Sequence, residues 1–446
     1  MPLNGAGAAT AGGWRSLLGR LEGQARLLAS VKLANVLLAM LWGFAVTFVF
    51  VRLLPLAEFK AFLLLVAFAN FTISADFGFS GIIYARLRRF RLRDGDGLFQ
   101  PAEIGMLFAF MTAIVLLGGL AIAICLASGF IPTERPALFM AFYILSALNI
   151  IALLAKRALA ALDYNLLWEG MDFVRRVLST GLLLAALAGL PILLSVCLQV
   201  GLTVAALFAG LATVHRTIGM SMGEWLLRRA DTACIARGYV RDMGATMALT
   251  VSDVAAYNAP YLGIALATHD PRPLLVFDFL FKMSRALSSA IRALVESGLP
   301  RLTRAHHAGS QDGVHRVIDR LRMLALASAL GLGALLLAAG PEISRLMFDG
   351  KAVLTRAELL FIAALLVGLA MICVSTYVQN GLGRFGRLLP PSLAFLAGSA
   401  LSVPVALLLA PWSGASFSLC FVGAYGFVHV LLGLRHGNML RGIARA

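Results

Sequence analysis

Five ionisable residues lie at helical spacing in one apolar segment of the chain. They are Asp278, Lys282, Arg285, Arg292 and Glu296. At about 100° per residue they share one face of a helix, within an arc of about 80°. A charge at the centre of a membrane helix costs about 2.5–3.5 kcal/mol on insertion scales, so each needs water or a partner. The stripe therefore predicts either a helix that lines a water-filled cavity or structural pairs such as Asp278 with Lys282.

Depth separates the members of this stripe. With a rise of about 1.5 Å per residue, Lys282 and Arg285 fall about 12 and 16 Å from the outer end of their helix, in a core about 30 Å thick. Arg292 and Glu296 fall near the inner boundary, where long side chains reach water. We expect Lys282, Arg285 and Asp278 in a substrate cavity, and Arg292 and Glu296 in structural roles.

The preceding helix supplies a further mid-depth carboxylate. Asp253 is followed by Tyr257, Asn258 and Pro260. Pro260 removes the helical hydrogen bond to the carbonyl of Ala256 and predicts a kink. Asp253 is thus a candidate for coupling to H⁺ or Na⁺, or else it neutralises a cavity cation. Asp253, Tyr257 and Asn258 complete the predicted substrate-binding set.

Another deep carboxylate, Asp76, comes at the end of the predicted helix 58–84. Arg86 and Arg89 follow it on the cytoplasmic side. Pairing with one of them predicts a structural role for Asp76.

The composition requires a membrane as solvent. Of the 446 residues, 60% are hydrophobic and 13% are charged, and the mean hydropathy is +0.88. These values exclude an ordinary soluble enzyme. The fold class predicted is an all-α polytopic membrane protein, with about twelve transmembrane helices in two six-helix lobes around a central cavity. The predicted helices span 31–51, 58–84, 104–127, 137–155, 177–190 (with an earlier start inside 166–176), 192–213, 244–267, 274–298, 323–340, 357–381, 388–409 and 412–434.

The basic residues predict the orientation. With the N-terminus inside, and with Lys32 and Lys60 at the helix ends counted with the adjacent segments, 28 of the 38 Lys and Arg residues fall on the inner side and seven on the outer side, as the positive-inside rule requires. The net charge of +16 therefore reflects topology, and no nucleic-acid partner is expected. The predicted divisions are a cytoplasmic segment 1–30 containing a basic–apolar stretch, lobes 31–213 and 244–434, a cytoplasmic linker 214–243 and a cytoplasmic tail 435–446.

Little in the chain favours an enzyme. The five cysteines form no CxxC pattern, so neither a disulfide framework nor a metal site is indicated. Only His429 lies within a predicted helix, where we interpret it as an interfacial residue. No Ser-His-Asp arrangement can be read from the sequence. We expect no cofactor, no metal and no catalytic residue.

One stretch resembles a known family. The chain has Arg52, Leu53, Pro55 and Phe59 at the first hairpin, then Asp76-Phe77-Gly78. This pattern resembles the polysaccharide biosynthesis proteins, the Wzx-type oligosaccharide flippases of the MOP superfamily. Those sequences often read Arg-x-Leu-Gly-Pro-x-x-Phe-Gly, then Asp-x-Gly. Leu54 and Lys60 replace the two glycines of the first motif here.

The resemblance implies a transporter in the inner (cytoplasmic) membrane that moves a glycan linked to polyprenyl pyrophosphate by alternating access. It implies membrane lipids, a glycan polymerase and glycosyltransferases as partners, and cationic cavity residues that face an anionic cargo. Two alternatives stay open. A MATE-type drug antiporter would need acidic cavity residues. A membrane-embedded polymerase or acyltransferase would need a large outer loop or a buried histidine.

The orientation gives a first testable prediction. Ser310 lies in a predicted inner loop, so a cysteine introduced there should resist a membrane-impermeant thiol reagent in intact cells and react after permeabilisation. The physical reason is the excess of basic residues on that side. Labelling of Ser310→Cys from outside in intact cells would contradict the orientation.

Overall fold

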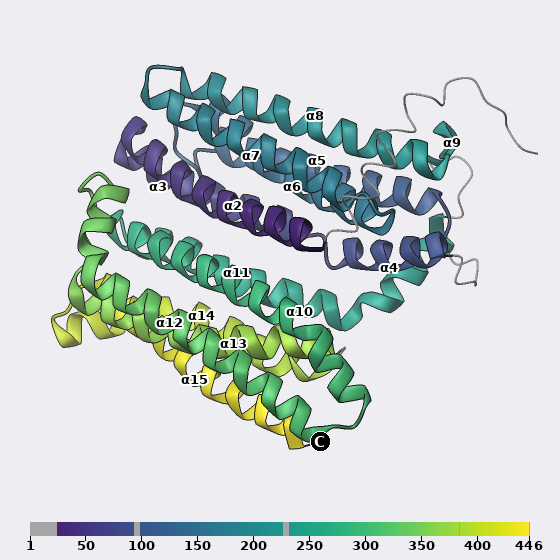
Figure 1. The fold of residues 1–446 in the computed structure, drawn as a ribbon. Coiled ribbons are helices and arrows are strands. Elements are labelled where there is room, and N and C mark those ends of the chain that lie inside the picture. Colours follow the sequence, from purple (N-terminus) through teal and green to yellow (C-terminus); the bar gives the residue numbers. More distant parts are fainter. Residues whose placement is uncertain (1–24, 93–98, 226–231, 383, 446) are drawn as a thin grey trace, which may run out of the picture. The chain divides into compact units, whose positions relative to one another are not determined.

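A computed structural model describes residues 25–92, 99–225, 232–382 and 384–445, and this part of the chain is helical without strands (Figure 1). The basic–apolar stretch of the predicted segment 1–30 and the basic residues Arg228 and Arg229 of the predicted linker lie outside the described residues. The elements are α2 (Ala25–Leu53), α3 (Leu56–Ser74), α4 (Phe79–Leu92), α5 (Ala102–Ala127), α6 (Pro136–Ala161), α7 (Asn165–Leu187), α8 (Ile192–Ile218), α9 (Met222–Trp225), α10 (Thr232–Ala267), α11 (Arg272–His307), α12 (Gln311–Met347), α13 (Arg356–Gly381), the short 3-10 helix η1 (Phe385–Arg387), α14 (Leu389–Ser413) and α15 (Phe417–Arg445).

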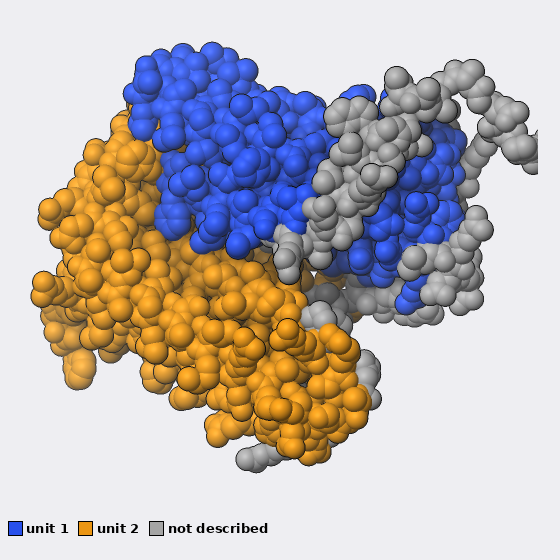
Figure 2. All heavy atoms as spheres, viewed as in Figure 1, with its two compact units in different colours: residues 1–45, 78–123, 140–243 blue, residues 46–77, 124–139, 244–446 orange. Residues whose placement is uncertain are grey.

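The helices group into two compact units (Figure 2). Unit 1 comprises 1–45, 78–123 and 140–243, and unit 2 comprises 46–77, 124–139 and 244–446. Helices α2, α5, α6 and α10 each contribute a segment to both units. The division into six-helix lobes stays a prediction, and the two units are described separately below.

Eight of the described helices are long and apolar enough to cross a membrane. They are α2, α5, α6, α8, α12, α13, α14 and α15. The other four predicted membrane helices correspond to α3, α7, α10 and α11. An all-α architecture with about twelve long helices is therefore confirmed. Helix α7 begins at Asn165, which agrees with the early start expected for the fifth helix.

Several predicted boundaries are wrong. Helices α10, α11 and α12 extend beyond the predicted 244–267, 274–298 and 323–340 by up to twelve residues at the ends next to the predicted cytoplasmic loops, because their polar ends stay helical. The segment 58–84 is not one helix, because it breaks between α3 and α4, where Phe77 and Gly78 have φ angles of 48° and 88°. A left-handed conformation ends an α-helix, and glycine adopts it without strain. The last helix does not end at 434, since α15 continues to Arg445. Polar residues past the apolar run continue its packed face.

Close packing of α13 against α15 depends on glycine. A Cβ on Gly433 would lie 2.7 Å from the Cα of Gly368, and one on Gly368 would lie 2.4 Å from the carbonyl oxygen of His429. No side chain fits at these distances. The small residues let the two backbones approach, as in other membrane helix pairs.

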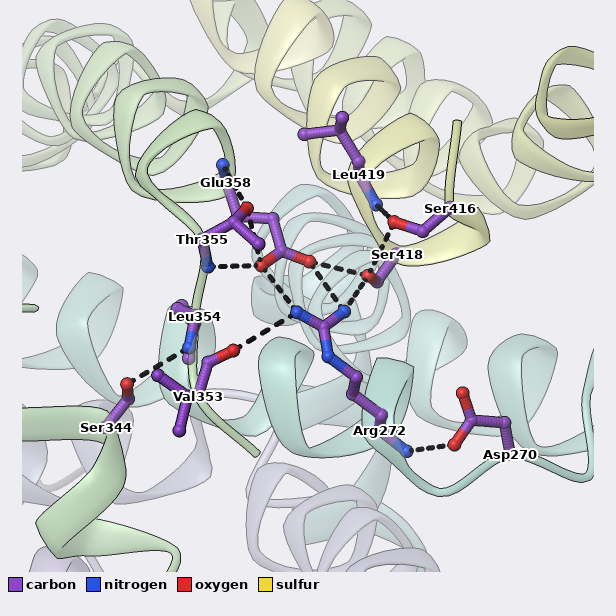
Figure 3. Close-up of polar contacts among 10 residues, drawn as sticks. All are labelled: Asp270, Arg272, Ser344, Val353, Leu354, Thr355, Glu358, Ser416, Ser418 and Leu419. Carbon is purple, nitrogen blue, oxygen red and sulfur yellow. Dashed lines mark hydrogen bonds and ion pairs between the residues drawn. The ribbon is translucent and has the colours of Figure 1, made fainter. Parts of the chain in front are cut away.

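A buried ion pair joins the starts of three helices in unit 2 (Figure 3). Arg272 of α11 donates through both terminal nitrogens to Glu358 of α13, at 2.9 Å each. Ser418 of α15 donates to Glu358 at 2.6 Å, and Thr355 completes a capping box with this carboxylate. Glu358 is fully buried. Two-point pairing with arginine satisfies the carboxylate and fixes the register of the three helices.

We predict that this pair is a main determinant of the stability of unit 2. Glu358→Gln keeps the side-chain shape but leaves Arg272 without its counter-charge. The free energy of unfolding should fall by about 1.5–3 kcal/mol, the range for a hydrogen bond to a charged group, because Arg272 is 28% exposed and keeps part of its hydration. Chemical denaturation in detergent, followed by circular dichroism, measures it. The matched control is Glu296→Gln in the exposed Arg292–Glu296 pair, which should change stability by less than about 1 kcal/mol. Equal losses for both variants would refute the prediction.

Candidate functional site

The described part of unit 2 contains a polar pocket with a cavity volume of about 300 Å³. Helices α3, α10, α11, α13, α14 and α15 line it. Its lining residues are Asn70, Asp253, Val254, Tyr257, Asn258, Phe281, Arg285, Ser288, Ile372, Cys373, Thr376, Tyr377, Asn380, Pro391, Ser392, Phe395, Leu432 and His436. We call this the unit 2 pocket. Four of the predicted substrate-binding residues, Asp253, Tyr257, Asn258 and Arg285, lie in it.

Helix α10 presents three of these residues along one face. Asp253 and Tyr257 are four residues apart, so they point the same way. Asn258 accepts a hydrogen bond from Asn70 of α3 at 3.2 Å and donates to the carbonyl of Val254 at 2.8 Å. These bonds hold the wall formed by α3 and α10 in one arrangement.

The proline of α10 is accommodated by a neighbouring helix. Pro260 lies inside α10 and has no N–H to offer the carbonyl of Ala256. Ser399 of α14, fully buried, donates its hydroxyl to this carbonyl instead. The orphaned backbone group is thereby satisfied inside the protein, and α14 is held against the pocket side of α10.

Arg285 and Asp253 are the formal charges of the pocket lining. The Arg285 guanidinium lies 5.7 Å from the centre of the Phe281 ring, a cation–π contact. Among the described residues, neither Arg285 nor Asp253 makes an ion pair. The pocket therefore offers one cation and one carboxylate whose charges no salt bridge occupies.

Lys282 and Asp278 do not line the unit 2 pocket. The prediction that Lys282 and Arg285 lie in one cavity therefore does not match the structure. Lys282 pairs with Asp278, the i,i+4 alternative considered for the stripe. Tyr261 donates to Asp278 at 3.0 Å and Thr47 of α2 donates to it at 3.2 Å. Asp278 is 1% exposed. With three donors this carboxylate is satisfied, and the group joins α2, α10 and α11 within unit 2.

The residues predicted to be structural lie away from the pocket. Arg292 and Glu296 form an exposed pair at 2.9 Å. Asp76 is buried in the break between α3 and α4. Arg86, one of its two predicted partners, forms an ion pair with Glu103 at 3.5 Å.

Sequence reasoning missed the histidines of α15. His429 was expected at the membrane interface, but it is fully buried and its Nδ1 lies 2.9 Å from the carbonyl oxygen of Tyr425. His436 was placed in a tail, whereas it lies inside α15 and lines the pocket. Tyr425, His429, Leu432 and His436 follow the i, i+4, i+7, i+11 spacing of one helical face. That periodicity was the signal available.

Unit 1 holds a second buried polar cluster. Two of its members, Lys156 and Glu169, fall in the segment 156–176 between two predicted membrane helices. Glu169 of α7, 1% exposed, pairs with Lys156 of α6 at 2.9 Å. Asn35 of α2 donates to Glu169 at 2.6 Å. Charged side chains lower the hydropathy of 156–176, so hydropathy alone does not predict a membrane helix there. In the structure, α6 and α7 cover most of this segment. The cluster shows each member paired, which favours a structural role.

Aromatic rings and amides surround the charges of the unit 2 pocket. The Tyr257 ring lies 5.0 Å from Phe395 and 6.4 Å from Phe281, both edge-to-face. Asn70, Asn258 and Asn380 add amides, which both donate and accept hydrogen bonds. No group of three His, Cys, Asp or Glu residues suited to a metal occurs among the described residues. This arrangement can bind a polar, ring-bearing ligand with an anionic group.

Comparisons with known proteins show the fold. No protein-family model matches the chain, and no curated protein matches it in sequence. Among solved structures, the D35N mutant of the Vibrio cholerae MATE transporter VcmN is 16% identical, with a TM-score of 0.61 over 96% of this chain and 98% of that one. The eukaryotic MATE transporter AtDTX14 is 15% identical (TM-score 0.56, 94% and 96%). A Pyrococcus furiosus MOP superfamily transporter, described as having a binding pocket of reverse polarity, is 11% identical (TM-score 0.54, 94% and 95%). The chain thus has the fold of MATE transporters.

We predict that Lys282 acts on stability through Asp278. Lys282→Ala leaves a buried carboxylate without its counter-charge, and the free energy of unfolding should fall by about 3–5 kcal/mol. The double variant Asp278→Asn/Lys282→Met removes both charges and should recover most of the loss. Denaturation in detergent measures both. If Lys282→Ala unfolds like the wild type but loses transport, Lys282 has the cavity role expected from the sequence.

Proposed function

We propose that the protein is a membrane transporter of the MOP superfamily that translocates a lipid-linked oligosaccharide or polysaccharide precursor, carried on polyprenyl pyrophosphate. The observation that carries the proposal is Arg285, a cation in the unit 2 pocket that no described carboxylate pairs with. Arginine can hold a phosphate through two parallel hydrogen bonds. In a partly dehydrated site this attraction is much stronger than in bulk water.

The rest of the pocket suits the glycan. Sugars present hydroxyl groups on their edges and apolar C–H faces, so amides and aromatic rings are matching partners. The amide-bearing Asn70 and Asn380 and the rings of Tyr257 and Phe395 occupy the same pocket as Arg285. The sequence resemblance to Wzx-type flippases supports the same cargo. The fold is that of transporters, and the proposal assigns this chain no catalytic step.

A second candidate function is drug or cation antiport. The MATE structures share the fold, and Asp253 provides a carboxylate that no described cation pairs with. A cationic drug would bind to Asp253, and Arg285 in the same pocket would repel it. The two functions therefore predict opposite results at these two residues.

The proposal includes location and partners. The protein would lie in the inner (cytoplasmic) membrane with both termini in the cytoplasm, because basic residues gather on that side. Glycosyltransferases would supply its cargo on the inner face and a glycan polymerase would use it on the outer face. These partners follow from the chemistry of the cargo.

A substitution series at Arg285 tests the proposal. Arg285→Ala should reduce glycan surface display at least about tenfold, since a charged hydrogen bond contributes about 1.5–3 kcal/mol. Arg285→Lys keeps the charge but loses the two-point geometry and should retain part of the activity, while Arg285→Glu should be inactive. The assay is glycan display in a strain that lacks the native protein, with membrane levels checked by immunoblot.

Arg292→Ala is the matched control, because Arg292 lies on the same helix outside the pocket and pairs with Glu296. It should leave display unchanged. Full display from Arg285→Glu, together with loss of drug export in Asp253→Asn, would favour the antiporter and overturn the flippase.

A further inference from the structure

His436 is a buried titratable group of the unit 2 pocket that the proposed function does not use. Its residue is 4% exposed and lies in the lining of the pocket. Its Nδ1 atom is buried and has no hydrogen-bond partner among the described residues. A buried polar atom without a partner is costly. A proton on this nitrogen would place a positively charged ring in the lining of the pocket.

The surroundings of His436 define how its charge can change. The charged and titratable groups of the pocket are Asp253 and Tyr257 from α10, Arg285 from α11, Cys373 and Tyr377 from α13, and the neighbouring Arg435 lies on α15 itself. Helices α3 and α14 contribute Asn70, Ser392 and Phe395, which do not titrate. In the empty pocket Arg285 balances the one carboxylate, and the burial of His436 disfavours a charge on its ring.

An anion reverses this balance. A phosphate-type group beside Arg285 adds negative charge to the pocket, and an adjacent cation then becomes favourable. An imidazole that gains a proton on Nδ1 changes this nitrogen from an acceptor without a donor into an N–H donor. The resulting imidazolium carries a positive charge that attracts the anion. One proton moves from solvent to His436, and no covalent bond in the ligand changes.

We propose that the unit 2 pocket holds a phosphate or pyrophosphate group between Arg285 and His436, and that His436 takes up a proton as the anion binds. This inference rests on the proposed function and adds proton uptake to its binding step. Because the bound state carries the additional proton, binding should strengthen as the pH falls.

The test uses the purified full-length protein and a sugar nucleotide, whose pyrophosphate diester does not titrate near neutral pH. Calorimetric titration in buffers of different ionisation enthalpy gives the number of protons taken up per bound anion. For the wild type we expect uptake of up to one proton. His436→Gln should abolish the uptake and weaken binding at acidic pH about tenfold, the effect of one charged hydrogen bond.

Two controls isolate His436. His315→Gln, on α12 outside the pocket, should bind and take up protons like the wild type. His436→Asn serves as a second variant, and thermal unfolding shows which of the two retains the fold. Proton uptake that persists in His436→Gln and disappears in Asp253→Asn would assign the proton to Asp253 and overturn the inference.

The inference and the proposed function fail in different ways. If the wild type does not bind the sugar nucleotide, the anion site is refuted and the proposed function with it. The same holds if a folded Arg285→Ala variant binds as tightly as the wild type. If the wild type binds through Arg285 without proton uptake, only the role of His436 is refuted. Uptake lost in folded His436 variants and kept in His315→Gln supports both.

Discussion

The cost of placing a charge in an apolar helical bundle is the constraint on which the rest of this structure depends. Buried carboxylates among the described residues offset this cost by pairing with a cation. Glu358 pairs with Arg272, Asp278 with Lys282 and Glu169 with Lys156. Each pair joins helices that are distant in sequence or fixes a turn. Such pairs contribute more to the uniqueness of the packing than to the net stability, because desolvation offsets much of their attraction.

The charges of the unit 2 pocket differ from these ion pairs. Arg285 and Asp253 lie in its wall without an ion pair, and His436 has a buried nitrogen without a partner. Polar groups left incomplete in a tightly paired interior are the groups a ligand can satisfy. The aromatic rings of Tyr257 and Phe395 beside them give the ligand an apolar face to contact.

The helices that hold the pocket are fixed by features at its edges. Glycines at 368 and 433 bring α13 and α15 together, and Ser399 attaches α14 to α10 at the carbonyl that Pro260 leaves free. The ion pair of Arg272 and Glu358 joins the starts of α11, α13 and α15. The pocket-lining side chains are therefore carried on helices whose relative positions are set elsewhere in unit 2.

The sequence by itself determined the helical class and the approximate number of long helices, because hydropathy and helical periodicity are local properties. It also selected Asp253, Tyr257, Asn258 and Arg285, which line one pocket. It did not separate Lys282 from Arg285. The two lie on one helical face, and only the packing of Thr47 and Tyr261 around Asp278 decides which charge is paired. It likewise did not find His436, since a polar tail and a polar helix end have similar composition. Only the contacts of α15 with its neighbours place that side chain in a pocket wall, because a residue's burial depends on segments far from it in sequence.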